Sequence, residues 1–145
     1  MLCVLATAAG ALAAPQSSAE SRLLGAVNAT RVAHGLHPLR LDPTLVRAAR
    51  GHSLEMLHGG YFAHGDVRGR LLASLVRNPL VGENLAWGSG SSASAATVIA
   101  EWLASPGHRA NLLRPSFTCI GIGATKGRFL GYGGATIFTA DFSGR

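Results

Sequence analysis

The hydrophobic pattern of the chain changes character once, near Pro115, and this change limits the folds that are open to it. Before Pro115, apolar residues recur at the three- and four-residue spacing of amphipathic helices. After it, the segments 119–125 and 135–142 alternate or are rich in β-branched residues, with a glycine-rich turn between them, as expected for paired strands. Helices followed by strands predict an α+β domain with layered helices on a small antiparallel sheet.

Capping residues mark where the helices begin. Ser17 and Glu20 have the spacing of a capping box. Asp42 followed by Pro43 combines an N-cap with a proline in the first helical position. Four helices are therefore expected, at 17–33, 42–58, 95–103 and 107–113. Two segments stay open: 66–82, with one short helix through 70–75, and 83–87, which is either extended or a turn.

The first fourteen residues are apolar and end in small residues, as in a secretory signal segment. Ala11-Leu12-Ala13 fits the cleavage pattern, although the basic start common in such segments is absent; the alternative is a buried N-terminal helix. Fourteen residues are too few to span a bilayer. We therefore expect a signal peptide at 1–14, a short linker at 15–20 and one folded domain at 21–145. The protein would be secreted or held in the cell envelope, with no transmembrane segment after signal removal.

The net charge of the chain limits the classes of partner that it can be expected to bind. The 145 residues suit one domain, and 13 basic against 7 acidic residues give a net charge of +6. This balance favours anionic partners such as nucleic acid, wall polymers or lipid headgroups, and export argues against nucleic acid.

Removal of the signal peptide leaves Cys119 as the one cysteine, so no internal disulfide can form. We expect Cys119 to carry a buried, unreactive thiol and the protein to be a monomer.

Several catalytic motifs are excluded by spacing. His52 and His58 are six residues apart, so they do not form the zinc-binding H-E-x-x-H pattern. Ser53 follows Gly51 and His52 in the middle of an expected helix, which is unlike a nucleophile elbow. Neither a phosphate-binding P-loop nor a dinucleotide-binding glycine pattern is present. We expect His52 to be a core histidine, and His34 and His37 to lie on the surface.

Three short segments combine titratable side chains with helix ends or loops. They are Y-F-A-H at 61–64, G-E-N at 82–84 and S-P-G-H-R at 105–109. Imidazole and carboxylate groups together can bind a divalent metal, or share a proton and activate water. Their separations, of about twenty residues, match no metal-ligand pattern. From spacing alone, a shared site and three separate structural roles both remain open.

The order of these segments resembles the CAP superfamily of cysteine-rich secretory, antigen 5 and pathogenesis-related 1 proteins, also called SCP domains. The similarity is greatest to the compact bacterial members and extends from about Ser21 to Phe142. The residues that carry it are Asn28, Arg31, Gly35, Leu36, Pro38, Leu39, Ala49, His52, Ser53, Met56, Tyr61, Phe62, His64, Gly82, Glu83, Asn84, Trp102, Ser105, Pro106, Gly107, His108, Arg109, Asn111, Leu112, Leu113, Gly121, Gly123, Asp141 and Phe142.

The resemblance implies an α-β-α sandwich with a central cleft. In eukaryotic members this cleft carries two histidines and two glutamates, of which His64, Glu83 and His108 match three. Ser105 occupies the position of the second glutamate, as is common in bacterial members. The resemblance thus makes His64, Glu83 and His108 the expected cavity residues. His64 and His108 are candidate ligands of a divalent cation such as Zn²⁺.

The family does not share one activity, so the resemblance leaves two functions open. The first is an exported, non-catalytic module that binds lipid, cell-wall polymer or a protein. The second is a metal-assisted, peptidase-like hydrolase in which Glu83 acts as the general base. Each residue also has a structural alternative: Glu83 can accept backbone hydrogen bonds, and His108 can hold its turn to the sheet.

Overall fold

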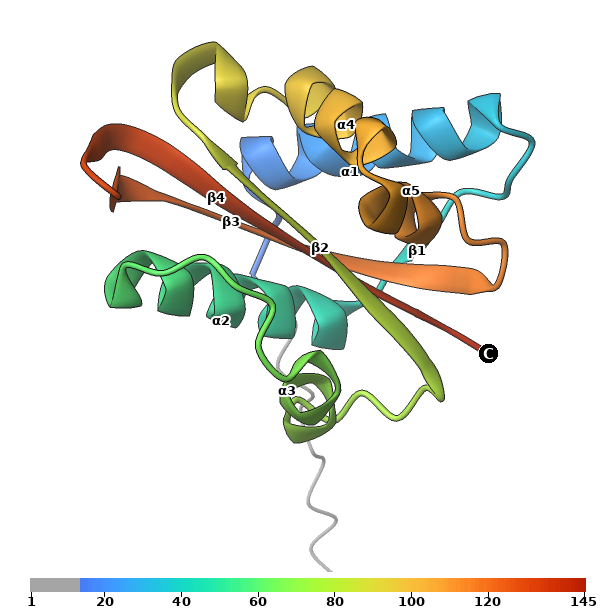
Figure 1. Ribbon diagram of the computed structural model, residues 1–145. Coiled ribbons are helices and arrows are strands. Elements are labelled where there is room, and N and C mark those ends of the chain that lie inside the picture. The colour runs from blue at the N-terminus through green and yellow to red at the C-terminus, as the bar shows by residue number, and fades with distance from the viewer. Residues whose placement is uncertain (1–13) are drawn as a thin grey trace, which may run out of the picture.

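The computed structural model describes residues 14–145, so almost all of the expected signal segment lies outside the described residues. Figure 1 shows a twisted sheet with helices on both faces. The helices are α1 (Ser18–Ala33), α2 (Pro43–Gly59), α3 (Val67–Ala73), α4 (Ala95–Ala104) and α5 (Pro106–Leu112), with a 3-10 turn, η1 (Gly90–Ala93), before α4. The strands are β1 (Arg40–Leu41), β2 (Leu80–Gly88), β3 (Phe117–Phe129) and β4 (Tyr132–Gly144).

The α+β class and the α-β-α sandwich are confirmed. The sheet order is β1-β3-β4-β2, with α1, α4 and α5 on one face and α2 and α3 on the other (Figure 1). The three long strands are antiparallel as predicted, but the two-residue β1 adds a parallel pair with β3, which makes the sheet mixed. The open segment 83–87 is extended and belongs to the nine-residue strand β2. The helix expected at 17–33 is α1, which begins at Ser18 after the N-cap Ser17.

The capping residues act as the sequence predicts. The backbone N–H of Glu20 donates to Ser17 Oγ at 3.2 Å, and that of Ser17 donates to Glu20 Oε2 at 2.7 Å. Asp42 Oδ1 accepts from the backbone N–H groups of Thr44 and Leu45 at 2.8 and 3.1 Å. These bonds satisfy donors that a helix start otherwise leaves unpaired, so they set where α1 and α2 begin.

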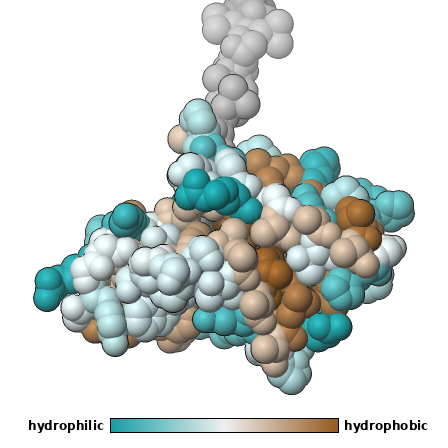
Figure 2. Space-filling view, turned by 90° about the horizontal axis from the view of Figure 1, so that it is seen from above, coloured by the Kyte–Doolittle hydropathy of each residue, from teal (hydrophilic) through white to brown (hydrophobic). Residues whose placement is uncertain are grey.

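A hydrophobic core lies on each side of the sheet. On the α1–α4–α5 side it contains Leu23, Val27, Trp102, Ile122 and Phe142. On the α2–α3 side, two smaller clusters form around Leu45 and Leu71 and around Met56, Phe129 and Ile137. Seen from above, apolar residues gather on the half of the surface where α1 and α5 lie, and the half over the Gly- and Ser-rich segment is paler (Figure 2).

Two glycines of β3 allow α2 to pack close to the sheet. A Cβ atom on Gly121 would lie 2.1 Å from the carbonyl carbon of Leu45, and one on Gly123 would lie 2.4 Å from that of Ala49. Contacts this short do not occur between real atoms, so any side chain here would push the helix away. The close approach fixes the first half of α2 against β3, and His52 and Ser53 follow on the next turn of the helix.

Arg31 ties the last turns of α1 to α5 and β3. Its guanidinium is buried and donates to the carbonyl oxygens of His37, Leu112, Arg114 and Phe117 at 2.9–3.3 Å. Four carbonyl oxygens thus take the place of a carboxylate as the partners of this buried cation. One side chain therefore fixes α1, the end of α5 and the start of β3 together.

Candidate functional site

Glu83 lies at the centre of the candidate site, in the middle of β2. Its side chain is buried, with 4% of the residue exposed. In the sheet register Glu83 stands directly opposite Asp141 of β4. Side chains of directly opposed residues in antiparallel strands lie on the same face and within contact range. The pairing of β2 with β4 therefore brings two carboxyl groups together inside the protein.

The residues on either side of Glu83 attach α5 to β2. Asn84 Nδ2 donates to the carbonyl oxygen of His108 at 2.9 Å. Asn111 Nδ2 donates to the carbonyl oxygen of Glu83 at 3.0 Å and lies 3.1 Å from Asn84 Oδ1. A Cβ atom on Gly82 would lie 2.8 Å from the Phe117 ring, so this position has no room for a side chain. The G-E-N segment thus places one carboxylate in the cleft and fixes the helix that carries His108.

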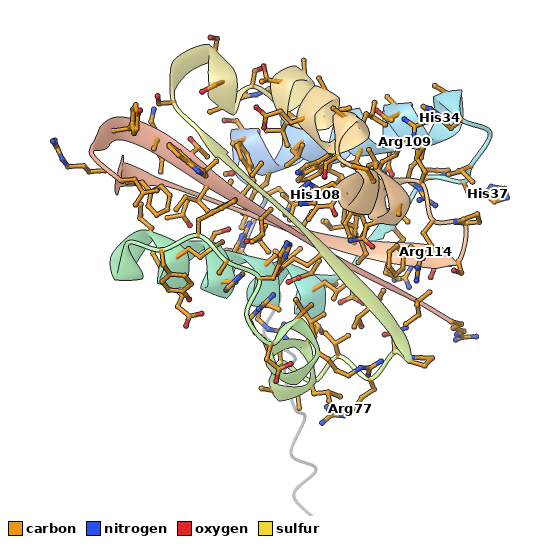
Figure 3. The ribbon with its side chains drawn as sticks, viewed as in Figure 1. His34, His37, Arg77, His108, Arg109 and Arg114 are labelled. Carbon is orange, nitrogen blue, oxygen red and sulfur yellow. The ribbon has the colours of Figure 1, made fainter. Side chains whose placement is uncertain are left out.

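The structure brings His64, Glu83 and His108 together. His64 Nδ1 lies 2.8 Å from Glu83 Oε1, and the rings of His64 and His108 have centroids 6.2 Å apart. His64 is half exposed, and His108 is partly buried on the first turn of α5, 6.5 Å from the Trp102 ring. In Figure 3, His108 lies beside the middle of β2, whereas His34 and His37 lie at the end of α1. The three residues predicted to line a cavity therefore lie close together beside β2, and we call their surroundings the cleft.

Arg70 and Asp141 complete the cleft, and sequence reasoning did not assign either of them to it. Arg70, on α3, forms a close ion pair with Glu83 Oε2, and its Nη2 lies 3.6 Å from Asp141 Oδ1. The same guanidinium donates to the carbonyl oxygen of His64 at 3.0 Å. Neither carboxylate oxygen of Asp141 makes a hydrogen bond within the described part of the chain. One arginine thus faces two buried carboxyl groups and also holds the segment that carries His64.

His52 and Ser53 have structural roles next to the cleft. His52 is buried, as expected for a core histidine, and its Nε2 lies 3.0 Å from the carbonyl oxygen of Ala63. This contact fixes the segment just before His64. Ser53 Oγ lies 2.8 Å from Thr139 Oγ1 and 3.2 Å from the carbonyl oxygen of Gly123. Its hydroxyl is buried in these bonds, so it is not placed to act as a nucleophile.

Burial shifts the pKa of both carboxyl groups and both histidines in the cleft. It raises the pKa of Glu83 to about 7, against the opposing effect of the Arg70 cation. The pKa of Asp141 is raised well above its ordinary range by burial and by the negative charge of Glu83. Burial lowers the pKa of His64 and of His108; the Arg70 cation adds to the effect at His64, and His64 adds to it at His108. The two imidazoles are therefore neutral at pH 7, and the two carboxyl groups hold a proton between them near that pH.

His64 and His108 are the two residues of the cleft that could bind a divalent metal. The Nδ1 atom of His64 faces Glu83, which leaves Nε2 to bind, and His108 supplies a second imidazole. Glu83 is engaged by Arg70 and acts as an outer partner of the histidine, an arrangement that orients metal-binding imidazoles in other proteins. Across residues 14–145, no group of three His, Cys, Asp or Glu side chains is arranged to hold a metal. Glu101, next to Trp102, is exposed and turned to solvent.

The fold and the cleft together define a domain of the SCP type. The family model of the cysteine-rich secretory protein family, CAP, matches residues 24–142. The chain belongs to this family. The resemblance inferred from the sequence is thereby confirmed.

Two curated relatives come from Bacillus subtilis. The protein YkwD is 32% identical over 134 residues, covering 89% of this chain and 48% of YkwD. The membrane protein YlbC is 34% identical over 116 residues, covering 77% of this chain and 33% of YlbC. The chain therefore spans between a third and a half of the length of these relatives.

Solved structures show the same fold. An extracellular protein with an SCP domain from Bacillus anthracis has a TM-score of 0.73 and 28% identity, covering 90% of this chain and 45% of that one. An outer surface protein from Borrelia burgdorferi has a TM-score of 0.74 and 21% identity, covering 90% of this chain and 96% of that one. None of the helices within residues 14–145 is long and apolar enough to cross a membrane.

Proposed function

We propose that the chain is an exported binding module whose ligand contacts His64 and His108. The observation that carries this proposal is the state of Glu83, which is buried and engaged by both Arg70 and His64. A general base needs a carboxylate within reach of water or substrate. The groups that this cleft presents to solvent are instead two neutral imidazoles, which donate and accept hydrogen bonds.

Export is supported by two observations. The first fourteen residues have the apolar run and the small-residue exit of a signal segment. Two proteins with this fold are described as extracellular and as an outer surface protein. Sequencing the N-terminus of protein recovered outside the cell should place it near Ala14. Recovery of the intact Met1 form only from the cytoplasm would overturn export.

The ligand class follows from export and charge. An exported domain with a net charge of +6 meets lipid headgroups, cell-wall polymers and other envelope proteins. Isolated wall polymer, lipid micelles and envelope protein extract are therefore the three probes to add in turn. Binding should shift the imidazole NMR signals of His64 and His108, while His34 and His37, exposed at the end of α1, serve as internal controls. Equal shifts at all four histidines would indicate unspecific binding and overturn the proposal.

A metal-assisted hydrolase is the second candidate. It is favoured by the hydrogen bond between His64 and Glu83 and by a Glu83 pKa near neutrality. A bound divalent cation would polarise a carbonyl group or activate water. The residues of the chain that would serve it are His64 Nε2 and His108 as ligands, with Glu83 orienting His64.

Calorimetric titration with Zn²⁺ separates the two functions. The hydrolase requires that wild-type protein takes up Zn²⁺, that His64→Ala and His108→Ala each abolish uptake with the fold intact, and that peptide cleavage is lost with the metal. The binding module predicts no peptide cleavage with or without Zn²⁺. Cleavage that disappears in the His108→Ala variant would overturn it.

A further inference from the structure

The turn between β3 and β4 contains a residue type that is unfavourable for the backbone conformation it adopts there. Leu130 and Gly131 form a two-residue loop between the paired residues Phe129 and Tyr132, with φ of +46° and +89°. Hairpin loops with positive φ at both positions strongly prefer Asn-Gly or Gly-Gly, because bulky side chains rarely adopt this conformation. Leu130 is nevertheless there, with 54% of its surface exposed. Leu75 is also an exposed leucine at positive φ, so a role of Leu130 outside the fold has to be inferred from its neighbours as well.

Aromatic residues surround the turn on one side. Tyr132 is 56% exposed, and its ring centroid lies 5.5 Å from that of the half-buried Trp87 at the end of β2. Trp87 in turn packs edge-on against the buried ring of Phe129, at 5.3 Å. Leu57 of α2 packs against the same buried cluster. We call the exposed part of this surface, Trp87, Leu130 and Tyr132, the hairpin tip.

Two cations flank the hairpin tip. Lys126 and Arg128 are exposed on the last residues of β3, and neither forms an ion pair or side-chain hydrogen bond with residues 14–145. No acidic residue occurs between Phe117 and Ala140. The apolar and aromatic hairpin tip thus lies next to two positive charges, and the hairpin contains no acidic residue that would neutralise them.

We propose that the hairpin tip docks on the surface of an anionic lipid bilayer. Leu130 would enter the boundary between headgroups and acyl chains, and Trp87 and Tyr132 would lie at the headgroup level, where tryptophan and tyrosine are enriched. Lys126 and Arg128 would contact lipid phosphates. A soluble anionic polymer would use the two cations but gives no reason for the strained, exposed leucine. The surface is separate from the cleft, because Trp87 lies four residues along β2 from Glu83, about 13 Å.

The two tryptophans of the chain provide a local readout. Trp87 lies in the hairpin tip, whereas Trp102 is 1% exposed and its Nε1 donates to the carbonyl oxygen of Leu85. Contact with a membrane should therefore shift the fluorescence of Trp87 to shorter wavelength and leave that of Trp102 unchanged. This readout matters because the apolar residues 1–14 of the full chain can also partition into lipid. Trp87→Phe provides the control for the assignment of the signal.

The experiment mixes the full chain with phosphatidylglycerol vesicles or phosphatidylcholine vesicles. Leu130→Asn is the key variant, because asparagine suits the turn and removes the apolar side chain, so the fold is kept or stabilised. Leu75→Asn is the matched control, since Leu75 is also an exposed leucine at positive φ (+68°, 67% exposed) but follows α3. Lys126→Gln with Arg128→Gln tests the charge.

We expect a Trp87 shift with phosphatidylglycerol vesicles that weakens as salt is raised and is much smaller with phosphatidylcholine. Leu130→Asn should lower the affinity about tenfold or more, and each lysine or arginine removed should lower it about fivefold. Leu75→Asn should bind like wild type. The proposal is overturned if wild type causes no Trp87 shift, if Leu130→Asn binds as well as wild type, or if Leu75→Asn loses as much affinity. His64→Ala should not affect this binding, so the result is independent of the function proposed for the cleft.

Discussion

Replacing Glu83 with glutamine tests whether the cleft holds a buried carboxyl pair with one proton. Glutamine keeps the shape of the side chain, and its amide oxygen can accept from Arg70 as Glu83 Oε2 does. Its amide group can donate to His64 Nδ1 when the imidazole carries its proton on Nε2. The substitution therefore removes one ionisable group and keeps the contacts, so its effect on stability should depend on pH.

The size and sign of the effect follow from the pKa of Glu83. Burial raises this pKa from its ordinary value of 4.5 to about 7 in the folded protein. The stability that the protonated group contributes is full below about pH 4.5 and is lost as the pH rises through about 7. At about 1.4 kcal/mol for each pKa unit, the loss amounts to about 3 kcal/mol. Glu83→Gln avoids this loss, and the remaining Asp141, freed from a neighbouring charge, can ionise beside Arg70.

Urea denaturation of both proteins at several pH values between 4.5 and 8 measures the effect. The free energy of unfolding of Glu83→Gln should match wild type near pH 4.5 and exceed it by up to about 3 kcal/mol at pH 8. The histidines with lowered pKa act in the opposite direction, but both proteins contain them, so the difference reports the Glu83–Asp141 pair. Asp141→Asn should show the same trend. A constant difference across this range, or a variant less stable than wild type at pH 8, would refute the shared proton.

Three further predictions concern the fold. Arg31→Met should lower the free energy of unfolding by about 3–5 kcal/mol in urea denaturation, because it leaves four carbonyl oxygens without their donor; an unchanged midpoint would contradict this. Gly121→Ala should cost about 2 kcal/mol or more in a thermal melt, since the new methyl group meets the α2 backbone, and a melt like wild type would show that α2 can move away. Cys119 is buried, so a thiol reagent should label it only in denaturant, and rapid labelling of native protein would contradict its burial.

The local parts of the fold could be predicted from the sequence. Ser17 with Glu20 and Asp42 with Pro43 set two helix starts by contacts within three residues, so their pattern carries the structure directly. The two strands after Pro115 could be predicted because their alternating pattern is local and a short turn joins them. The parallel pairing of β1 could not be predicted, because it joins Arg40 and Cys119 across most of the domain.

The segments that form the candidate site could be predicted from the sequence, but two of its residues could not. The resemblance pointed to His64, Glu83 and His108, which lie together. No short sequence pattern assigns Arg70 or Asp141 to the site. Arg70 enters the cleft because α3 turns one face toward β2. Asp141 enters it because β4 pairs with β2 in the register that places Asp141 opposite Glu83. Strand order and register depend on the packing of the whole domain, and no short pattern encodes them.

The position of the second carboxyl group determines what the cleft can bind. The resemblance implies that Ser105 replaces a second glutamate of eukaryotic members, whereas here a second carboxyl group, that of the fully buried Asp141, lies opposite Glu83 in the sheet. A buried acid beside Arg70 and Glu83 serves the internal charge balance and is closed to ligand. An ionised Glu83 only accepts hydrogen bonds, so His64 then carries its proton on Nδ1 and presents Nε2 as an acceptor. A ligand at His64 must therefore offer a hydroxyl, an N–H group or a cation. A cation needs the imidazole of His108 as a second ligand, whereas a hydroxyl group needs only His64. If binding survives His108→Ala and is lost in His64→Ala, the ligand is therefore held by hydrogen bonds.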